Sequence, residues 1–593
     1  MKNYTLKTLG VLATCSVLLS SCADSFDTSF FEKEIVDPEL QIALPVGYVS
    51  YTATELFEEL GEDLTVGETQ DGTNSLISFT YSESLSGSGN DDFVKVDNQG
   101  FEGEFKLFDN TDEIPDGDFN YALGTVSGDQ VEENFYEIEP LTQADNTPLN
   151  EDFKQIQFRS GNLAINLFTN TSSETVVTFT IPSLIRKSDN SEFSETFVLN
   201  NNSGSDITLA DVDLSEYMLE LTYDSLNPKT KNGFNNLAVE LNAIINFEEN
   251  DAINKNNLLA YTITTAGLEI EAALGDFKNR SFQVNNQTFE LDFFEELGDG
   301  NIAFKNPTLK ISANNTYGFP IGLELDNIST NANTNNNLMI IDNGSTNDHI
   351  LKDNGINYVV FDAGTSTDGG VTSTSTTTEI ILNNKNSNLV DLLNQKPTEF
   401  NLNVSGIANP GATTTNDNFF NPANSLDVTI DVEIPLHASF DGLSFSEEID
   451  FDNAEDIQEN AKSITLDVRT INAMPLAGTI QLQFLDNQNN NLGIDKTVEA
   501  FNACPIGNDG YSTGSIDANG TVTGTISDQH TELVFTENEI DLLAQATKIN
   551  LIVTFNSTDN NGDNTPDAIK LRTTDTVRMQ LGLVGDLKFS DNE

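Results

Sequence analysis

Oxygen-bearing side chains alternate through a nine-residue segment near the end of the chain, Asp559-Asn560-Asn561-Gly562-Asp563-Asn564-Thr565-Pro566-Asp567. The side chains of Asp559, Asn561 and Asp563 can converge on one point, because Gly562 allows the tight turn that this needs. Asp567 would then close the site. Calcium takes about six to eight oxygen ligands, so the pattern predicts a structural calcium site. A solvated hairpin turn without metal is the alternative.

This segment resembles the calcium loops of thrombospondin type 3 repeats, whose pattern is D-x-D-G-D-G-x-P-D. It departs from them where Asn561 replaces an acid and Asn564 replaces a glycine, and it occurs once where such repeats form arrays. The resemblance implies a calcium ion with a structural role, held by Asp559, Asn561, Asp563 and Asp567. No catalytic cofactor is expected.

A second candidate for chemistry is Cys22, at the end of Leu19-Ser20-Ser21-Cys22. Two lysines and an apolar run of about a dozen residues precede it, and this run is too short for a bilayer span of about 20 residues. The segment resembles a bacterial lipobox. The resemblance implies that residues 1–21 are a signal peptide and that Cys22 becomes an acylated first residue. Residues 22–38 then form a lipidated tether to the membrane, because several acyl chains give stable anchoring.

The residues after Cys22 bear on the destination of the protein. Ala23 stands where Asp would favour retention in the inner membrane of Gram-negative bacteria, so the resemblance implies the outer membrane. The acidic residues 24–27 (Asp-Ser-Phe-Asp) are similar to surface-export signals of Bacteroidota lipoproteins. Together with the acidic, Asn- and Thr-rich composition, they make the chain resemble surface lipoproteins of that phylum. We therefore expect surface exposure rather than a periplasmic orientation.

Two tripeptides, Asp224-Ser225-Leu226 and Asp575-Thr576-Val577, match the O-glycosylation pattern of exported Bacteroidota proteins. Ser225 and Thr576 are the implied acceptors. A pattern of three residues also arises by chance.

Residue types typical of enzyme active sites are scarce. The chain has three histidines, none in a zinc-binding pattern, and it lacks the phosphate-loop motifs. It also has no Trp, the side chain on which sugar rings most often stack, which argues against glycan-active proteins. These observations favour a protein that is not an enzyme. A pair of catalytic carboxylates cannot be chosen among 94 acids, so a glycoside hydrolase stays an alternative.

The charge excludes one class of partner. The 27 Lys and Arg stand against 94 Asp and Glu, a net charge of −67, so no nucleic acid partner is expected. After removal of the signal peptide and acylation of Cys22, Cys504 is the one remaining thiol, and no intramolecular disulfide can form. We expect Cys504 to be a buried small side chain.

These candidate sites must be positioned by β-strands, because apolar residues alternate with polar ones in many segments. The longest alternations run over residues 237–247 and 426–436, and shorter ones cover 163–167, 177–181, 268–272 and 480–484. Such alternation is typical of antiparallel sandwiches with one face on a core. Two short helices are predicted, one after the capping box Thr536-Glu537-Asn538-Glu539 and one after Ser387 that ends before Pro397. The predicted fold is all-β, with several antiparallel sandwich-like domains.

Composition shifts suggest domain boundaries. We expect an N-terminal β-rich module over 39–150 and a central module over 151–326. A loop-rich region, 327–436, would complete the central module, and a C-terminal module with one short helix would cover 437–593. A faint repeat links residues 308–321 with 465–476, since each contains a strand, an Asn turn and a Pro before the next strand.

The sequence thus favours a non-catalytic outer-membrane lipoprotein that acts as a binding or structural subunit at the cell envelope. Its expected partners are the membrane, through the lipid anchor, and another outer-membrane protein or an extracellular ligand. The alternatives are a glycan-utilisation accessory protein or glycoside hydrolase, and a calcium-stabilised surface adhesin.

Overall fold

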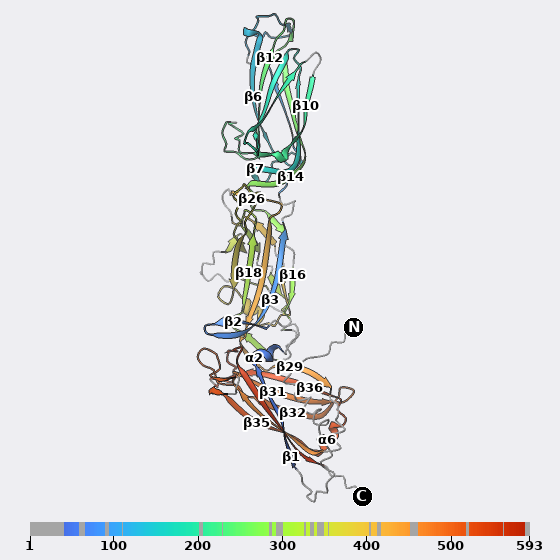
Figure 1. The fold of residues 1–593 in the computed structure, drawn as a ribbon, viewed down its shortest axis with the longest axis vertical. Coiled ribbons are helices and arrows are strands. Elements are labelled where there is room, and N and C mark those ends of the chain that lie inside the picture. The colour runs from blue at the N-terminus through green and yellow to red at the C-terminus, as the bar shows by residue number, and fades with distance from the viewer. Residues whose placement is uncertain are drawn as a thin grey trace.

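The computed structural model describes residues 41–58, 66–88, 94–109, 111–200, 205–227, 229–283, 287–291, 294, 300–324, 328–332, 337–340, 349–353, 355–402, 405–411, 417–450, 461–517, 521–560 and 562–587. Its strands form three β-sandwich units stacked along the long axis of the molecule, which we call the base, middle and distal units (Figure 1).

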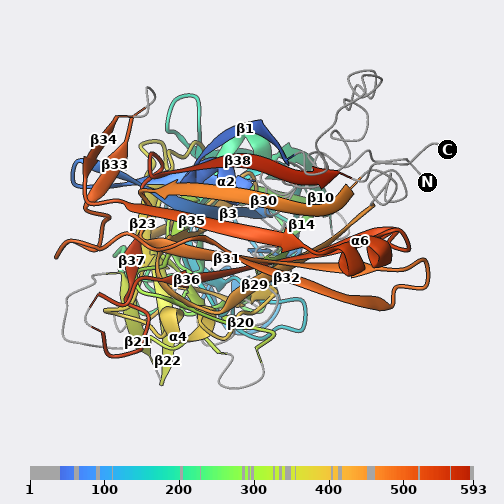
Figure 2. The same cartoon turned by 90° about the horizontal axis from the view of Figure 1, so that it is seen from below.

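The base unit contains the first and the last described strands of the chain. One of its four-stranded sheets has the order β1-β38-β30-β35 and the other β29-β36-β31-β32, with antiparallel pairing throughout. The strands are β1 (Gln41–Thr52), β29 (Leu443–Asp450), β30 (Ala461–Asn472), β31 (Leu476–Leu485), β32 (Asn491–Phe501), β35 (Ser527–Phe535), β36 (Lys548–Ser557) and β38 (Thr576–Leu587). Seen from below, the two sheets lie as separate layers (Figure 2).

The middle unit repeats this arrangement. Its sheets contain the orders β3-β27-β18-β23 and β15-β25-β19-β22, again antiparallel, with β2 (Val66–Asp71) and β21 (Ile350–Asp353) added at edges. The strands are β3 (Asn74–Ser88), β15 (Ser281–Gln283), β18 (Thr308–Asn315), β19 (Ile321–Glu324), β22 (Ile356–Phe361), β23 (Thr376–Leu382), β25 (Ser405–Ala408) and β27 (Ser425–Pro435).

The distal unit has the same two sheets, β4-β14-β7-β10 and β6-β12-β8-β9. The strand β11 (Tyr217–Glu220) pairs with both β7 and β8 and so joins them into one continuous sheet. The strands are β4 (Gly100–Lys106), β6 (Gln130–Pro140), β7 (Asp152–Thr169), β8 (Glu174–Arg186), β9 (Glu192–Leu199), β10 (Ser205–Asp213), β12 (Asn236–Asn246) and β14 (Leu258–Asp276). A short strand, β26 (Asn418–Phe420), extends this sheet beside β14.

All three units share one topology. Numbered in chain order within each unit, the eight strands form sheets of order 1-8-3-6 and 2-7-4-5. This is the strand order of a jelly roll. A short helix follows the sixth strand in every unit: α6 (Glu537–Leu543) in the base, α4 (Leu389–Leu393) in the middle and the 3-10 helix η3 (Leu214–Glu216) in the distal unit. The molecule is therefore built from three copies of one architecture.

The three jelly rolls are nested. The chain enters the middle unit after the first strand of the base, enters the distal unit after the first strand of the middle, and then returns in reverse order. Among the three units, only the distal one has all eight of its strands on one continuous segment, and β26, which extends its sheet, comes from the loop between β25 and β27. In Figure 1 the blue first strand, β1, and the orange to red last strands lie together in the base, whereas the distal unit occupies the opposite end.

One corner recurs in each unit, where the third strand ends and the fourth begins in the opposite sheet. The last residue of the third strand is fully buried and polar: Thr169, Asn315 and Asn472. The next residue donates its backbone N–H to the carbonyl of the first residue of the eighth strand, at 3.4 Å, 3.0 Å and 2.9 Å respectively. These bonds set the same register between the third and eighth strands three times.

The structure confirms the all-β fold and the two helices predicted from sequence. The helix α6 begins at the predicted capping box, in which Thr536 and Glu539 bond reciprocally. The expected consecutive modules differ from the observed pairing, because strands from residues 39–150 lie in all three units. Residues 327–436 supply β22, β23, α4, β25 and β27 of the middle unit.

Candidate functional site

The predicted calcium loop follows β36 in the base unit. Asp559 accepts backbone N–H bonds from Gly562 at 2.7 Å and Asn564 at 2.8 Å. Asp567 accepts one from Asn560 at 2.8 Å, and Asp563 accepts one from Thr565 at 2.8 Å. The three carboxylates therefore shape the loop by binding its own amides.

These contacts leave the calcium prediction open. In the described part of the chain, no group of three or more His, Cys, Asp or Glu side chains is placed to hold a metal ion. Asn561, the remaining predicted ligand, lies outside the described residues. A carboxylate that accepts an amide hydrogen bond retains lone pairs for a cation, so calcium binding by Asp559, Asn561, Asp563 and Asp567 stays a prediction.

The predicted lipidation and glycosylation sites lie in other parts of the chain. Cys22 and the lipobox lie outside the described residues. Ser225 is exposed in the loop after β11, beside Leu226, which is 93% exposed. Thr576 is only 9% exposed, and its hydroxyl donates to the carbonyl of Thr574 at 3.0 Å. Glycosylation of Thr576 would therefore have to precede folding, whereas Ser225 is accessible in the folded chain.

Cys504 is fully buried, as expected, and its thiol contacts the carbonyl of Asn472 at 3.1 Å. Burial raises the pKa of this thiol, which disfavours the reactive thiolate. Among the histidines, His437 bonds through Nδ1 with the amide of Asn306 at 2.9 Å, a contact that positions it as a structural residue.

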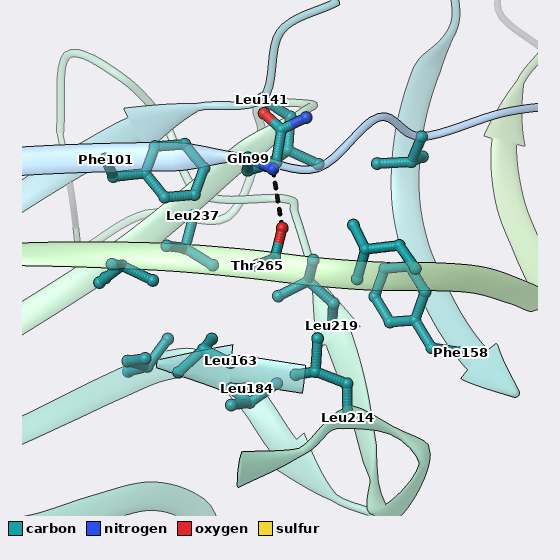
Figure 3. Close-up of a pocket in the computed structure, with 14 residues that line it drawn as sticks. Gln99, Phe101, Leu141, Phe158, Leu163, Leu184, Leu214, Leu219, Leu237 and Thr265 are labelled. Atoms are coloured by element: carbon teal, nitrogen blue, oxygen red, sulfur yellow. Dashed lines mark hydrogen bonds between the residues drawn. The ribbon is translucent and has the colours of Figure 1, made fainter. Parts of the chain in front are cut away.

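The interior of the distal unit contains a small void of about 30 Å³ (Figure 3). Leucine side chains from both sheets and from η3 point into it, with two polar neighbours, Gln99 and Thr265. The backbone N–H of Gln99 donates to the Thr265 hydroxyl at 2.7 Å, and the Gln99 side chain bonds with Asp97 and Thr142. This void has room for one water-sized group, so it is a feature of core packing rather than a ligand site.

A titratable cluster lies in the same unit, at the open seam between β4 and β6. The hydroxyl of the buried Tyr261 contacts Glu137 at 2.9 Å and Glu139 at 2.8 Å. Burial and the nearby charges of Glu137 and Glu102 raise the pKa of Glu139, although the Tyr261 hydrogen bond opposes them. A side chain at Gly103 would clash, because its Cβ would lie 2.3 Å from the Tyr261 ring. The single hydroxyl proton of Tyr261 is thus shared between the carboxylates of Glu137 and Glu139.

No described helix has the length and apolar character needed to cross a membrane. No family model matches the chain, and no curated protein matches it. A Parabacteroides distasonis protein designated as secreted aligns over 53% of this chain and 88% of its own length, with 13% identity and a TM-score of 0.27. The VP2 subviral particle of infectious bursal disease virus covers 88% of this chain and 83% of its own, with 7% identity and a TM-score of 0.13. Likenesses this low carry no argument about function.

Proposed function

We propose that the protein is a non-catalytic, lipid-anchored subunit of the outer membrane that presents a binding surface away from the cell. The lipobox around Cys22 supports the anchor, and the nested order of the three jelly rolls supports the presentation. Because the first described strand lies in the base, a lipid on Cys22 would hold the molecule by that unit. The distal unit then faces outward.

The surface presented at the outer end is the connection between the first and second distal strands, residues 107–129. In the base unit the connection between the first and second strands contains the middle unit, and in the middle unit it contains the distal unit. In the distal unit the described residues of this connection contain no further unit: Tyr121 stacks on Phe247 with ring centroids 4.4 Å apart, and its hydroxyl bonds with Asp129 at 2.9 Å. Leu123 in this loop is 59% exposed. A single exposed leucine is ordinary on a protein surface, so the binding role rests on the position of this connection at the outer end.

Labelling of intact cells tests the proposal. An epitope inserted after Gly117, in the distal connection, should be reached by antibody on unbroken cells, and Cys22→Ala should release the protein from the membrane fraction. Radiolabelled palmitate should label the wild type and not the variant. Equal palmitate labelling of both would refute the anchor, and an epitope reached only after lysis would refute surface presentation. An epitope at the periplasmic face of a known outer-membrane protein serves as the lysis control.

A further inference from the structure

The base–middle joint and the middle–distal joint occupy equivalent places in the strand topology. The groups that lie between the units differ at the two joints. At the joint of the base and middle units, Lys570 and Tyr511 both bond to Asp71, and Lys570 lies 5.1 Å from the centre of the Tyr511 ring. Backbone bonds join Ile77 to Leu571 and Leu436 there as well. This joint is closed by side chains and main chain.

The joint of the middle and distal units instead contains a cleft of about 210 Å³. Three segments form it: residues 94–96, which lead up into β4, the irregular part of β7 and β14 around Arg159 and Leu268, and Pro422, which follows β26 in the middle-unit loop between β25 and β27. The chain crossing into the distal unit and a loop of the middle unit therefore line the cleft. Joints between domains are common positions for small-molecule sites.

The cleft combines apolar walls with two cations and one carboxylate, that of Glu269. Its apolar lining consists of Val94, Val96, Leu268, Ile270 and Pro422. The cations are Lys95 and Arg159, in a chain that has only 27 Lys and Arg among 593 residues. Their side chains are 67% and 59% exposed, so both remain accessible to a ligand.

Each of these two side chains forms an ion pair with one carboxylate and still has N–H donors that can bind a second carboxylate. Arg159 bonds to Glu269 through Nε at 3.3 Å, and in the described part of the chain its two Nη groups have no hydrogen-bond partner. Lys95 contacts Asp97 at 3.2 Å, which engages one of its three donors. A guanidinium held at Nε presents its Nη groups as a fork, which is the geometry that binds a carboxylate with two parallel bonds.

We propose that this cleft binds a small organic carboxylate with an apolar body. The carboxylate bonds with the Nη groups of Arg159 and with Lys95, while the body packs on Leu268, Ile270 and Pro422. Because Pro422 belongs to the loop between β25 and β27 of the middle unit, the ligand bridges the two units and stiffens their joint. This site is independent of the anchor and of the distal surface 107–129.

Binding of phenylacetate and of its neutral amide, phenylacetamide, to the full chain tests the proposal by saturation-transfer NMR. Phenylacetate should bind at least tenfold more tightly than phenylacetamide. Arg159→Gln should weaken phenylacetate binding at least tenfold, and Arg159→Lys should lose most of it, since lysine lacks the fork. Arg469→Gln is the matched control, because Arg469 is similarly exposed and ion-paired, but on the outer face of the base unit. Arg469→Gln should leave the affinity for phenylacetate unchanged.

The amide comparison needs no variant, so it remains decisive even if Arg159→Gln disturbs the fold. Equal binding of acid and amide to the wild type would overturn the proposal. So would phenylacetate binding that survives Arg159→Gln in a variant with an unchanged circular dichroism spectrum. Binding lost equally in Arg469→Gln would indicate general charge attraction and would also overturn it.

Discussion

At the scale of single residues, the pair Glu137 and Glu139 competes for the one proton of Tyr261. The raised pKa of Glu139 means that the folded distal unit binds a proton more tightly than the unfolded chain does. Its stability should therefore rise as pH falls through the folded pKa of Glu139, and this gain is complete below the ordinary value of 4.5. Above the folded pKa, the charged form costs stability.

Glu139→Gln removes this charge and keeps an oxygen for the Tyr261 hydroxyl. We expect the free energy of unfolding of the distal unit to rise by roughly 0.5–1 kcal/mol at pH 7, because solvent screens a partly exposed charge. Below pH 4 the difference should vanish. Glu104→Gln on neighbouring β4 is the control, as Glu104 is exposed. Thermal unfolding across pH 4–8 measures the effect, and a gain that persists unchanged at pH 4 would exclude a charge origin.

The calcium loop gives a second prediction at this scale. If calcium binds only the folded loop, saturation at 100 times the dissociation constant stabilises the base unit by about 2.7 kcal/mol. Asp563→Asn with Asp567→Asn keeps the acceptors for Thr565 and Asn560 but removes two anionic ligands. The double variant should melt like the wild type in chelator and lose the calcium-dependent increase.

Magnesium separates binding from screening of the net charge of −67. A flexible loop with many oxygen ligands prefers calcium, whereas screening is similar for both ions. An increase in melting temperature that is equal for both ions, or that survives in the double variant, would show that the loop holds no calcium.

At the scale of elements, the buried corner after the third strand accounts for how the chain changes sheets. Asn472 donates from Nδ2 to the carbonyls of Met474 at 3.0 Å, Leu476 at 2.9 Å and Asn502 at 2.7 Å. Asn315 uses the same geometry, donating to Phe319 at 3.0 Å and accepting from Tyr317 at 2.9 Å. In the distal unit, the Thr169 hydroxyl donates to the carbonyl of Leu258 at 2.9 Å and accepts from the Thr171 N–H at 3.3 Å. A buried side chain thus satisfies carbonyls that the strand change leaves without partners.

Asn472→Ala and Asn472→Asp should both destabilise the base unit by about 3 kcal/mol, because each removes the donor and leaves buried carbonyls unsatisfied. The exposed hairpin residue Asn490 bonds only locally, to Asp486. Asn490→Ala should cost about 0.5 kcal/mol. Denaturant unfolding measures both, and a small effect of Asn472→Asp would show that the Nδ2 contacts are not what stabilises the corner.

Much of this element-scale structure was predictable from sequence. Alternation located strands such as β12 and β27, and the capping box located α6, because these signals are local. The repeat of residues 308–321 and 465–476 pointed to two of the corners. The third was missed because Thr169 replaces Asn and no Pro follows. Pairing of the first strand with the last joins Gln41 to Asp586, and no local pattern specifies such a distant partner.

The candidate site was less predictable for the same reason. The calcium loop is one continuous segment, and its turn at Gly562 has the positive φ of 73° that the sequence implied. The cleft at the upper joint combines Lys95, Arg159 and Pro422, which are far apart in the chain. The proton shared by Glu137, Glu139 and Tyr261 likewise depends on β6 and β14 meeting across a seam, which requires the tertiary fold.

At the scale of the whole molecule, nesting decides which parts can fold alone. The distal unit is one continuous segment, whereas the middle unit needs β3 from before the distal insertion and the base unit needs β1 from before both. In each unit the first strand pairs with the eighth along its length, as Thr52 with Thr576, Ser88 with Ser425 and Lys106 with Leu258. A fragment without its first strand therefore exposes the edge of the eighth strand and part of the core.

Residues 94–277 expressed alone should therefore fold and unfold cooperatively, since all eight strands of the distal unit and its core are present. Residues 281–436 alone should not, because they lack β3, whose Ile77 and Phe79 are fully buried in the middle unit. Circular dichroism and denaturant unfolding distinguish the two, and fusing residues 66–88 ahead of residues 281–436 through a flexible linker should restore a cooperative transition. If 281–436 folds without β3, or if 94–277 does not fold, the units are not independent jelly rolls. The nesting would then describe only the path of the chain, and the three units would not be the units that fold cooperatively.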